Sequence, residues 1–131
     1  MNICLDTSAY SHMHRGHPPA VHLIAAADRI FVPVIVLGEL RAGFLGGSKR
    51  PMNEALLHVF LQDPTERIGT IDADTASAYA KLDHQLHQAG TPIPKNDLWI
   101  AAVAVRVGAT IVTYDAHFRR LRGVEVRLLA A

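Results

Sequence analysis

Met1-Asn2-Ile3-Cys4-Leu5-Asp6-Thr7-Ser8 is the stretch of sequence that decides the fold. Residues 3–5 form an apolar run that is too short for a helix and suits a buried strand. Asp6 ends this run with a charge, and Thr7 and Ser8 can cap a helix that follows. In open α/β sheets, ligands bind just beyond the carboxyl ends of the strands. Asp6 is therefore a candidate ligand-binding residue, although a carboxylate at this position can also simply cap a helix.

The rest of the chain alternates between strands and helices. Further strands are predicted at residues 30–32, 67–71, 110–113 and 124–128. Helices are predicted at residues 8–15, 20–28, 34–44, 52–62, between an Asp72 cap and Gly90, and at 96–107, with one or two helical turns at 115–121. This alternation predicts an α/β sandwich, in which helices cover both faces of a parallel sheet. We expect one domain that spans residues 1–131, because this length leaves no room for a second.

Composition narrows the class of protein. Half of the 131 residues are hydrophobic, which is enough for a mostly aliphatic core. No apolar run reaches the roughly 18 residues that a membrane span requires, and the N-terminus does not resemble a signal peptide. The single cysteine, Cys4, excludes an internal disulfide and is typical of a reducing compartment. The chain is therefore predicted to be cytoplasmic.

Three more carboxylates occupy unusual positions. Glu39 lies inside the apolar helix at 34–44, where a charge without a partner is disfavoured. Asp97 opens the apolar helix at 96–107, where Asn96 already supplies a cap. Asp115 follows the strand at 110–113 as Asp6 follows the first strand. Each position also has an ordinary explanation, namely an exposed helix edge, the helix dipole or a turn. Together with Asp6 they form a more specific pattern.

A metal-dependent phosphodiesterase needs such a set of carboxylates. Mg²⁺ and Mn²⁺ prefer hard oxygen ligands, and the bound ion generates hydroxide near neutral pH and stabilises charge on phosphoryl oxygens. If the four acids converge, 8 of the 12 acidic residues remain elsewhere, against 13 lysines and arginines. A basic body around an acidic site suits a polyanion that is held by its phosphates.

With these residues in place, the chain resembles the PIN-domain ribonucleases, specifically the VapC-type toxins of bacterial toxin–antitoxin pairs. The resemblance rests on an ordered set of motifs that covers residues 5–118. The motifs are Leu5-Asp6-Thr7-Ser8, Glu39-Leu40 with Gly43, Asn96-Asp97 followed by Ile100-Ala101-Ala102, and Thr113-Tyr114-Asp115 with Phe118.

The resemblance implies a five-stranded parallel sheet in the order 3-2-1-4-5, so that Asp6 and Asp115 meet where the winding reverses. It also implies an endoribonuclease that depends on Mg²⁺ or Mn²⁺, with Asp6, Glu39, Asp97 and Asp115 as catalytic residues and metal ligands. Neighbouring polar residues are expected to orient a ligand or a metal-bound water; these are Thr7, Ser8, Asn96 and Thr113. Proteins of this kind typically form homodimers and are inhibited by a cognate antitoxin.

Other readings remain open at this point. A PIN-type nuclease that processes RNA without an antitoxin fits the same residues. A non-enzymatic α/β binding module and a phosphoryl-accepting signalling domain are further alternatives, although no glycine-rich phosphate loop is present and Glu39 has no evident role in signalling.

Basic and histidine residues allow two more interpretations. Arg119 and Arg120, with Arg122 and His117, follow Asp115 directly and are candidates for binding the RNA backbone, or they form a solvated basic turn. The histidines at 12, 14 and 17 and those at 84 and 87 form a conceivable zinc site, which the absence of partner cysteines disfavours.

Overall fold

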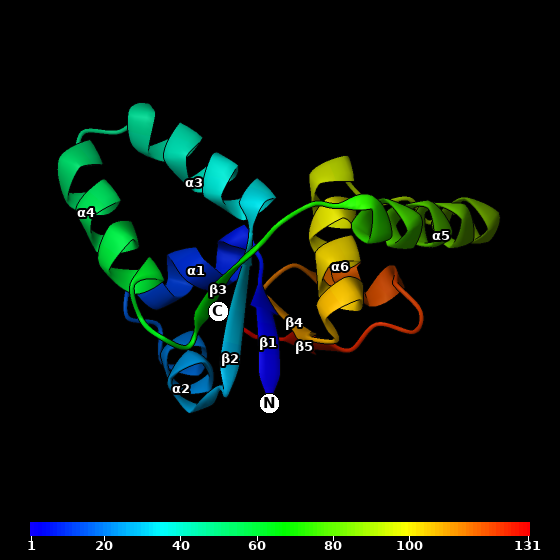
Figure 1. Cartoon of the computed structure of the whole chain (residues 1–131), viewed down its shortest axis with the longest axis horizontal. Coiled ribbons are helices and arrows are strands. Elements are labelled where there is room, and N and C mark those ends of the chain that lie inside the picture. The colour runs from blue at the N-terminus through cyan, green and yellow to red at the C-terminus, as the bar shows by residue number, and fades with distance from the viewer.

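The computed structural model describes all 131 residues and contains one five-stranded parallel sheet. Its strand order is β3-β2-β1-β4-β5, with every neighbouring pair parallel. The strands are β1 (Asn2–Leu5), β2 (Arg29–Pro33), β3 (Glu66–Gly69), β4 (Thr110–Thr113) and β5 (Val126–Leu128). The predicted strand order is confirmed, and β1 and β4 lie side by side where the winding reverses (Figure 1).

Helices cover both faces of this sheet, as predicted for an α/β/α sandwich. The helices are α1 (Thr7–His14), α2 (Pro18–Ala26), α3 (Val34–Leu45), α4 (Arg50–Leu61), α5 (Ala73–Ala89) and α6 (Lys95–Val107), with a 3₁₀ helix η1 (Ala116–Arg120) after β4. Figure 1 shows α1 to α4 on one side of the strands and α5 and α6 on the other. None of these helices is long and apolar enough to cross a membrane.

Helix ends follow from local sequence in most places. Asp72 caps α5 through a capping box with Thr75, as predicted, and Gly90 ends that helix in the left-handed conformation. The predicted cap of α6 was wrong. Asn96 does not cap α6, because Pro94 occupies the N-cap position and Asn96 lies in the first turn. The rigid Pro94 already sets an extended backbone there, so the helix starts one residue before Asn96.

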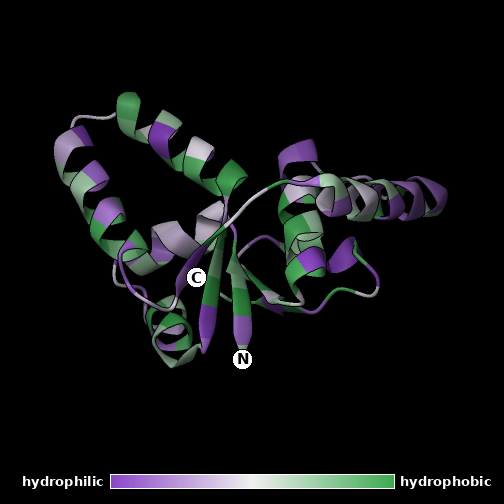
Figure 2. Ribbon diagram, viewed as in Figure 1, coloured by the Kyte–Doolittle hydropathy of each residue, from purple (hydrophilic) through white to green (hydrophobic).

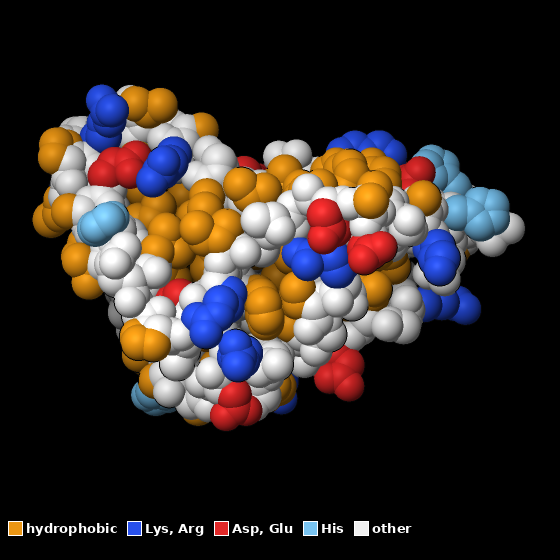
Figure 3. Space-filling view, in the orientation of Figure 1, with side chains coloured by type: hydrophobic (Ala, Val, Ile, Leu, Met, Phe, Trp, Pro, Cys, Tyr) orange, Lys and Arg blue, Asp and Glu red, His pale blue; other side chains and the backbone are white.

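The core is densest around β1 and α6. Residues 3–5 of β1 are completely buried, and α6 buries a run of side chains, which are Leu98, Ile100, Ala101, Ala102, Val103 and Ala104. Helices α3 and α4 are less buried than their apolar composition implies, with Leu45 63% exposed and Val59 67% exposed. Figure 2 shows hydrophobic residues along both helices, and Figure 3 shows hydrophobic side chains gathered over them on the face that it draws.

Gly69 marks the closest approach between the sheet and α6. A Cβ atom added to Gly69 would lie 2.6 Å from Cγ1 of Val103 and 3.3 Å from Cα of Pro33. We expect Gly69→Ala to lower the free energy of unfolding by about 1–3 kcal/mol, because the extra methyl group overpacks this contact. Chemical denaturation measures the effect.

Gly43→Ala is the matched control for this prediction. No atom lies within 4 Å of a Cβ built on Gly43, which is in a helix interior. This variant is expected to gain about 0.5–1 kcal/mol of stability. Equal stability changes in the two variants would contradict the steric explanation.

Candidate active site

Asp6 lies at the carboxyl end of β1 and has two structural roles. It is the N-cap of α1, where its Oδ1 accepts a hydrogen bond from the backbone N–H of Ala9 at 2.8 Å. The Ser8 hydroxyl donates to both carboxylate oxygens, at 2.8 and 2.9 Å. The predicted caps, Thr7 and Ser8, are instead the first two residues of α1. Asp6 therefore caps the helix and still lies at the switch point, so the two readings of its sequence position are compatible.

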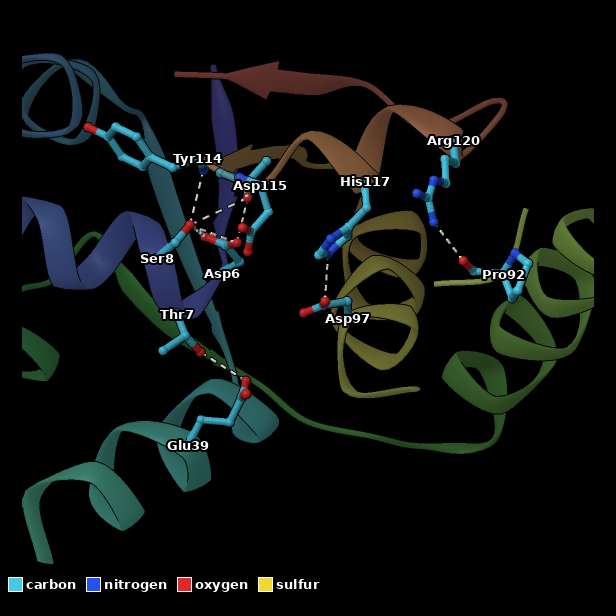
Figure 4. A network of polar contacts seen from close by, with 11 residues as sticks. Asp6, Thr7, Ser8, Glu39, Pro92, Asp97, Tyr114, Asp115, His117 and Arg120 are labelled. Carbon is cyan, nitrogen blue, oxygen red and sulfur yellow. Dashed lines mark hydrogen bonds and ion pairs between the residues drawn. The ribbon is translucent and has the colours of Figure 1, made fainter. Parts of the chain in front are cut away.

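Two hydroxyl groups join Asp6 to the end of β4. Thr113 donates to Asp6 Oδ2 and accepts from the backbone N–H of Asp115 at 2.9 Å. Ser8 accepts from the backbone N–H of Tyr114 at 3.0 Å while it donates to Asp6. Each hydroxyl thus connects the carboxylate after β1 to the backbone after β4 (Figure 4). These hydrogen bonds hold the backbone of Tyr114 and Asp115 in place. They support an orienting role for Ser8 and Thr113.

Glu39 reaches the same region from α3 and lies next to the start of α1 (Figure 4). The Thr7 hydroxyl donates to Glu39 Oε1 at 2.9 Å. Glu39 also borders a cavity of about 450 Å³ between the starts of α3 and α6, which Asn96 lines from the opposite side. Asn96 itself is exposed and makes no side-chain hydrogen bond within the protein. A charge inside this apolar helix is tolerated because Glu39 is partly exposed and accepts the hydrogen bond from Thr7.

Asp97 comes from the first turn of α6 and pairs with His117 of η1. The distance between His117 Nε2 and Asp97 Oδ2 is 2.6 Å. No pattern in the sequence predicts this pair, because the two residues are brought together only when η1 packs beside the start of α6. Asp115 follows β4 and is exposed, and its carboxylate makes no hydrogen bond or ion pair within the protein.

The four carboxylates are near enough to influence one another, but they do not yet form one coordination shell. Burial raises the pKa of Asp6, and the charge of Asp115 raises it further against the hydrogen bonds of Thr113, Ala9 and Ser8. Burial also raises the pKa of Asp97, and Glu39 and Asp115 contribute to this rise while His117 opposes it. However, no three His, Cys, Asp or Glu side chains lie close enough together to hold an ion between them.

The arginines after Asp115 differ in their surroundings. Arg120 donates to the backbone carbonyl of Pro92 at 2.8 Å and so ties η1 to the connector before α6. This contact gives Arg120 a structural role that the sequence did not indicate. Arg119 is exposed and makes no such contact, which leaves it available for an anionic ligand.

A group of aromatic and histidine side chains packs around Tyr114, in the loop that follows β4. The His12 ring stacks on Tyr114 with a centroid distance of 3.8 Å, and His17 Nδ1 lies 2.6 Å from the Tyr114 hydroxyl. These two histidines therefore pack against Tyr114, and no group of three metal-binding side chains supports the zinc site considered from the sequence.

Comparison with known proteins agrees with this geometry. A family model for the PIN domain matches residues 3–124. Ribonuclease VapC5 of Mycobacterium tuberculosis is 32% identical over 91% of this chain and 87% of its own length. Ribonuclease VapC2 of Rickettsia felis is 33% identical over 89% of this chain and 90% of its own length. The chain belongs to the PIN-domain family.

A solved structure supports the same conclusion about the PIN fold. The crystal structure of VapBC2 from Rickettsia felis, bound to a DNA fragment from the promoter, has a TM-score of 0.84 to this chain. It is 30% identical in sequence and the match covers 97% of this chain and 98% of that one. The resemblance to VapC-type PIN proteins that the sequence motifs indicated is confirmed, as is the α/β fold.

The raised pKa of Asp6 predicts a pH-dependent difference in stability. A carboxyl group whose pKa is raised on folding is easier to protonate in the folded state than in the unfolded state. Its ionisation therefore lowers the free energy of unfolding, and this loss grows as the pH rises from the ordinary pKa near 3.9 through the folded-state pKa. We expect Asp6→Asn to unfold at a higher temperature than the wild type at pH 7 in EDTA, since Asn keeps the helix cap.

The advantage of Asp6→Asn is expected to shrink as the pH falls through the raised folded-state pKa, and to vanish once the pH is below the ordinary value near 3.9, where the wild-type carboxyl group is protonated in both states. Thermal unfolding across this pH range measures it. A difference that does not change with pH would show that the charge of Asp6 is not what destabilises the protein.

Proposed function

We propose that this protein is the ribonuclease toxin of a toxin–antitoxin pair and that it hydrolyses RNA phosphodiester bonds with a divalent metal ion, Mg²⁺ or Mn²⁺. The observation that carries the proposal is the arrival of four carboxylates from four different elements at the carboxyl edge of the sheet. They are Asp6 after β1, Glu39 on α3, Asp97 on α6 and Asp115 after β4. Relatives named as VapC ribonucleases support the class of reaction.

The donor set fits a hard cation. All four side chains offer carboxylate oxygens, the ligands that Mg²⁺ and Mn²⁺ prefer, and Thr7, Ser8 and Thr113 hold two of them by hydrogen bonds. Burial raises the pKa values of Asp6 and Asp97, and the charges of the neighbouring carboxylates add to the rise, an addition that a bound cation would oppose. When bound, the ion would supply a hydroxide near neutral pH and stabilise the charge that develops on the phosphoryl oxygens.

The residues of the site would have two roles, which are metal binding and RNA contact. The Ser8 and Thr113 hydroxyls hold the Asp6 carboxylate and the backbone N–H of Asp115 at the switch point, where these two acids would supply metal ligands. Asp97, which pairs with His117, and Glu39, which accepts from Thr7, would supply the other carboxylate ligands from α6 and α3. Asn96 and Arg119, which are both exposed, would contact the RNA, and the excess of basic residues elsewhere favours its phosphates.

Partner proteins follow from the same assignment. The similar structure of VapBC-5 from Mycobacterium tuberculosis is that of a member of the VapBC family of toxin–antitoxin systems, which supports a cognate antitoxin for this chain. We further propose a homodimer, because α3 and α4 leave hydrophobic side chains such as Leu45 and Val59 exposed. A cytoplasmic site of action agrees with the single, completely buried Cys4.

Cleavage of total bacterial RNA by the purified protein tests the reaction. We expect cleavage with Mg²⁺ or Mn²⁺, none in EDTA, and a loss of about a hundredfold or more in Asp97→Asn and Asp115→Asn, since each removes a metal ligand. Asp74→Asn removes an exposed acid of α5 outside the site and should leave the rate unchanged. Cleavage that persists in EDTA and in both variants would rule out the four-acid site.

Metal binding can be tested without any RNA. A ligand that binds only the folded state at a concentration of 100 times its Kd adds about 2.7 kcal/mol to the free energy of unfolding. Mg²⁺ or Mn²⁺ should therefore raise the midpoint of thermal unfolding of the wild type, and Asp115→Asn should lose this rise while Asp74→Asn keeps it. An equal rise in all three proteins would place metal binding elsewhere in the chain.

A further inference from the structure

Glu66 is a buried acid that the proposed ribonuclease site does not use. It is the first residue of β3, at the opposite end of the parallel strands from the four carboxylates. Glu66 is only 7% exposed, and its Oε2 atom is buried without a hydrogen-bond partner. No ion pair within the protein involves its carboxyl group. A buried acceptor left unpaired costs about 1–3 kcal/mol, so the position calls for an explanation.

A cavity of about 360 Å³ lies beside Glu66, between α2, the end of α4 and the starts of β2 and β3. Its walls are mainly apolar, and the polar part of its lining comes from the segment that leads into β3. The lining residues are Ile24, Ala25, Ala27, Ile30, Val59, Phe60, Asp63, Thr65 and Glu66. This volume is far larger than the roughly 30 Å³ of one water and falls within the usual range for small-ligand sites.

The charged groups of this cavity are all acidic. Asp63 lies at the rim, and the backbone N–H and hydroxyl of Thr65 hold the pKa of Asp63 below its ordinary value, so it is ionised at neutral pH. Burial raises the pKa of Glu66 to about 8, and the charge of Asp63 contributes to this rise. No lysine, arginine or histidine lines the cavity, and Arg67, which follows Glu66, donates to the backbone carbonyls of Pro64 and Glu66.

We propose that this cavity binds a cationic nitrogen carried on a short apolar stem, with the Glu66 carboxylate as its buried counterion. The apolar walls match the stem, the Glu66 carboxyl group, which has no ion-pair partner within the protein, accepts a hydrogen bond from the nitrogen, and Asp63 attracts the positive charge to the entrance. Acidic groups exclude an anion, and an uncharged ligand would leave the buried carboxylate without a counterion. The same chemistry is found in small alkylamines and in a lysine or arginine side chain of another polypeptide.

Calorimetric titration of the full chain with n-butylamine and with N-acetylarginine methylamide tests the proposal. We expect at least one of the two cations to bind, at least tenfold more weakly to Glu66→Gln, and with the same affinity to Glu54→Gln. Glu54 is a matched control because it lies on α4 but pairs with Arg41 outside the cavity. At pH 7 the binding should release a proton from Glu66, which comparing buffers of different ionisation enthalpy detects.

A second variant protects the test against misfolding of Glu66→Gln. Ala25→Phe places a ring at the exposed side of the cavity and leaves Glu66 in place, so it should abolish binding in a protein of unchanged circular dichroism. Binding of butylamine alone would identify a free amine as the ligand, whereas tighter binding of the arginine derivative would identify a polypeptide side chain.

Three results would overturn the proposal. They are the failure of both cations to bind, equal affinity of wild type and Glu66→Gln, and equal affinity of the wild type for n-butylamine and n-butanol. The RNA-cleavage and metal-binding tests use residues at the other end of the strands. This site and the ribonuclease site can therefore fail independently.

Discussion

The contact between the ends of β1 and β4 is the constraint on which the site depends. Asp6 is almost completely buried, and a buried carboxylate persists only where hydrogen-bond donors surround it. The chain supplies two hydroxyls and one backbone N–H, and both hydroxyls also accept from the backbone that leads to Asp115. One set of hydrogen bonds therefore caps α1, satisfies a buried charge and joins the two strands at the switch point. The register of β1 against β4, which pairs Leu5 with Val112, brings these groups together.

The other two acids are attached to the sheet more loosely. Glu39 and Asp97 come from helices on opposite faces, and each has a single side-chain partner, Thr7 or His117. Glu39 and Asp97 therefore reach the site from α3 and α6, whereas Asp6 is held at the switch point by several hydrogen bonds. The four carboxylates lie near each other without forming a closed set of ligands. Like charges crowded in one place repel, and the two helical acids reduce this repulsion by pairing elsewhere.

Acids at the two ends of the strands show how burial depends on neighbours. Asp6 and Glu66 are both buried and both have a raised pKa. Asp6 is surrounded by donors that its own strand ends provide, whereas Glu66 opens a strand at a point where the adjoining helices supply only apolar side chains. The first arrangement holds a charge at the switch point, and the second leaves a carboxyl group without a partner beside a hollow of the surface.

The sequence by itself determined the order of the elements, the parallel sheet and the carboxylates expected to meet. Apolar runs of strand length ended by Asp6 and Asp115, and the Asp72 cap and Gly90 stop, are local signals that hydrogen bonding within a few residues enforces. Only the tertiary structure decided the pairing of Asp97 with His117, the anchoring of Arg120 to Pro92 and the burial of Glu66. These contacts join residues that are distant in the chain or belong to different layers. The packing of helices on the sheet fixes them, and no local pattern records that packing.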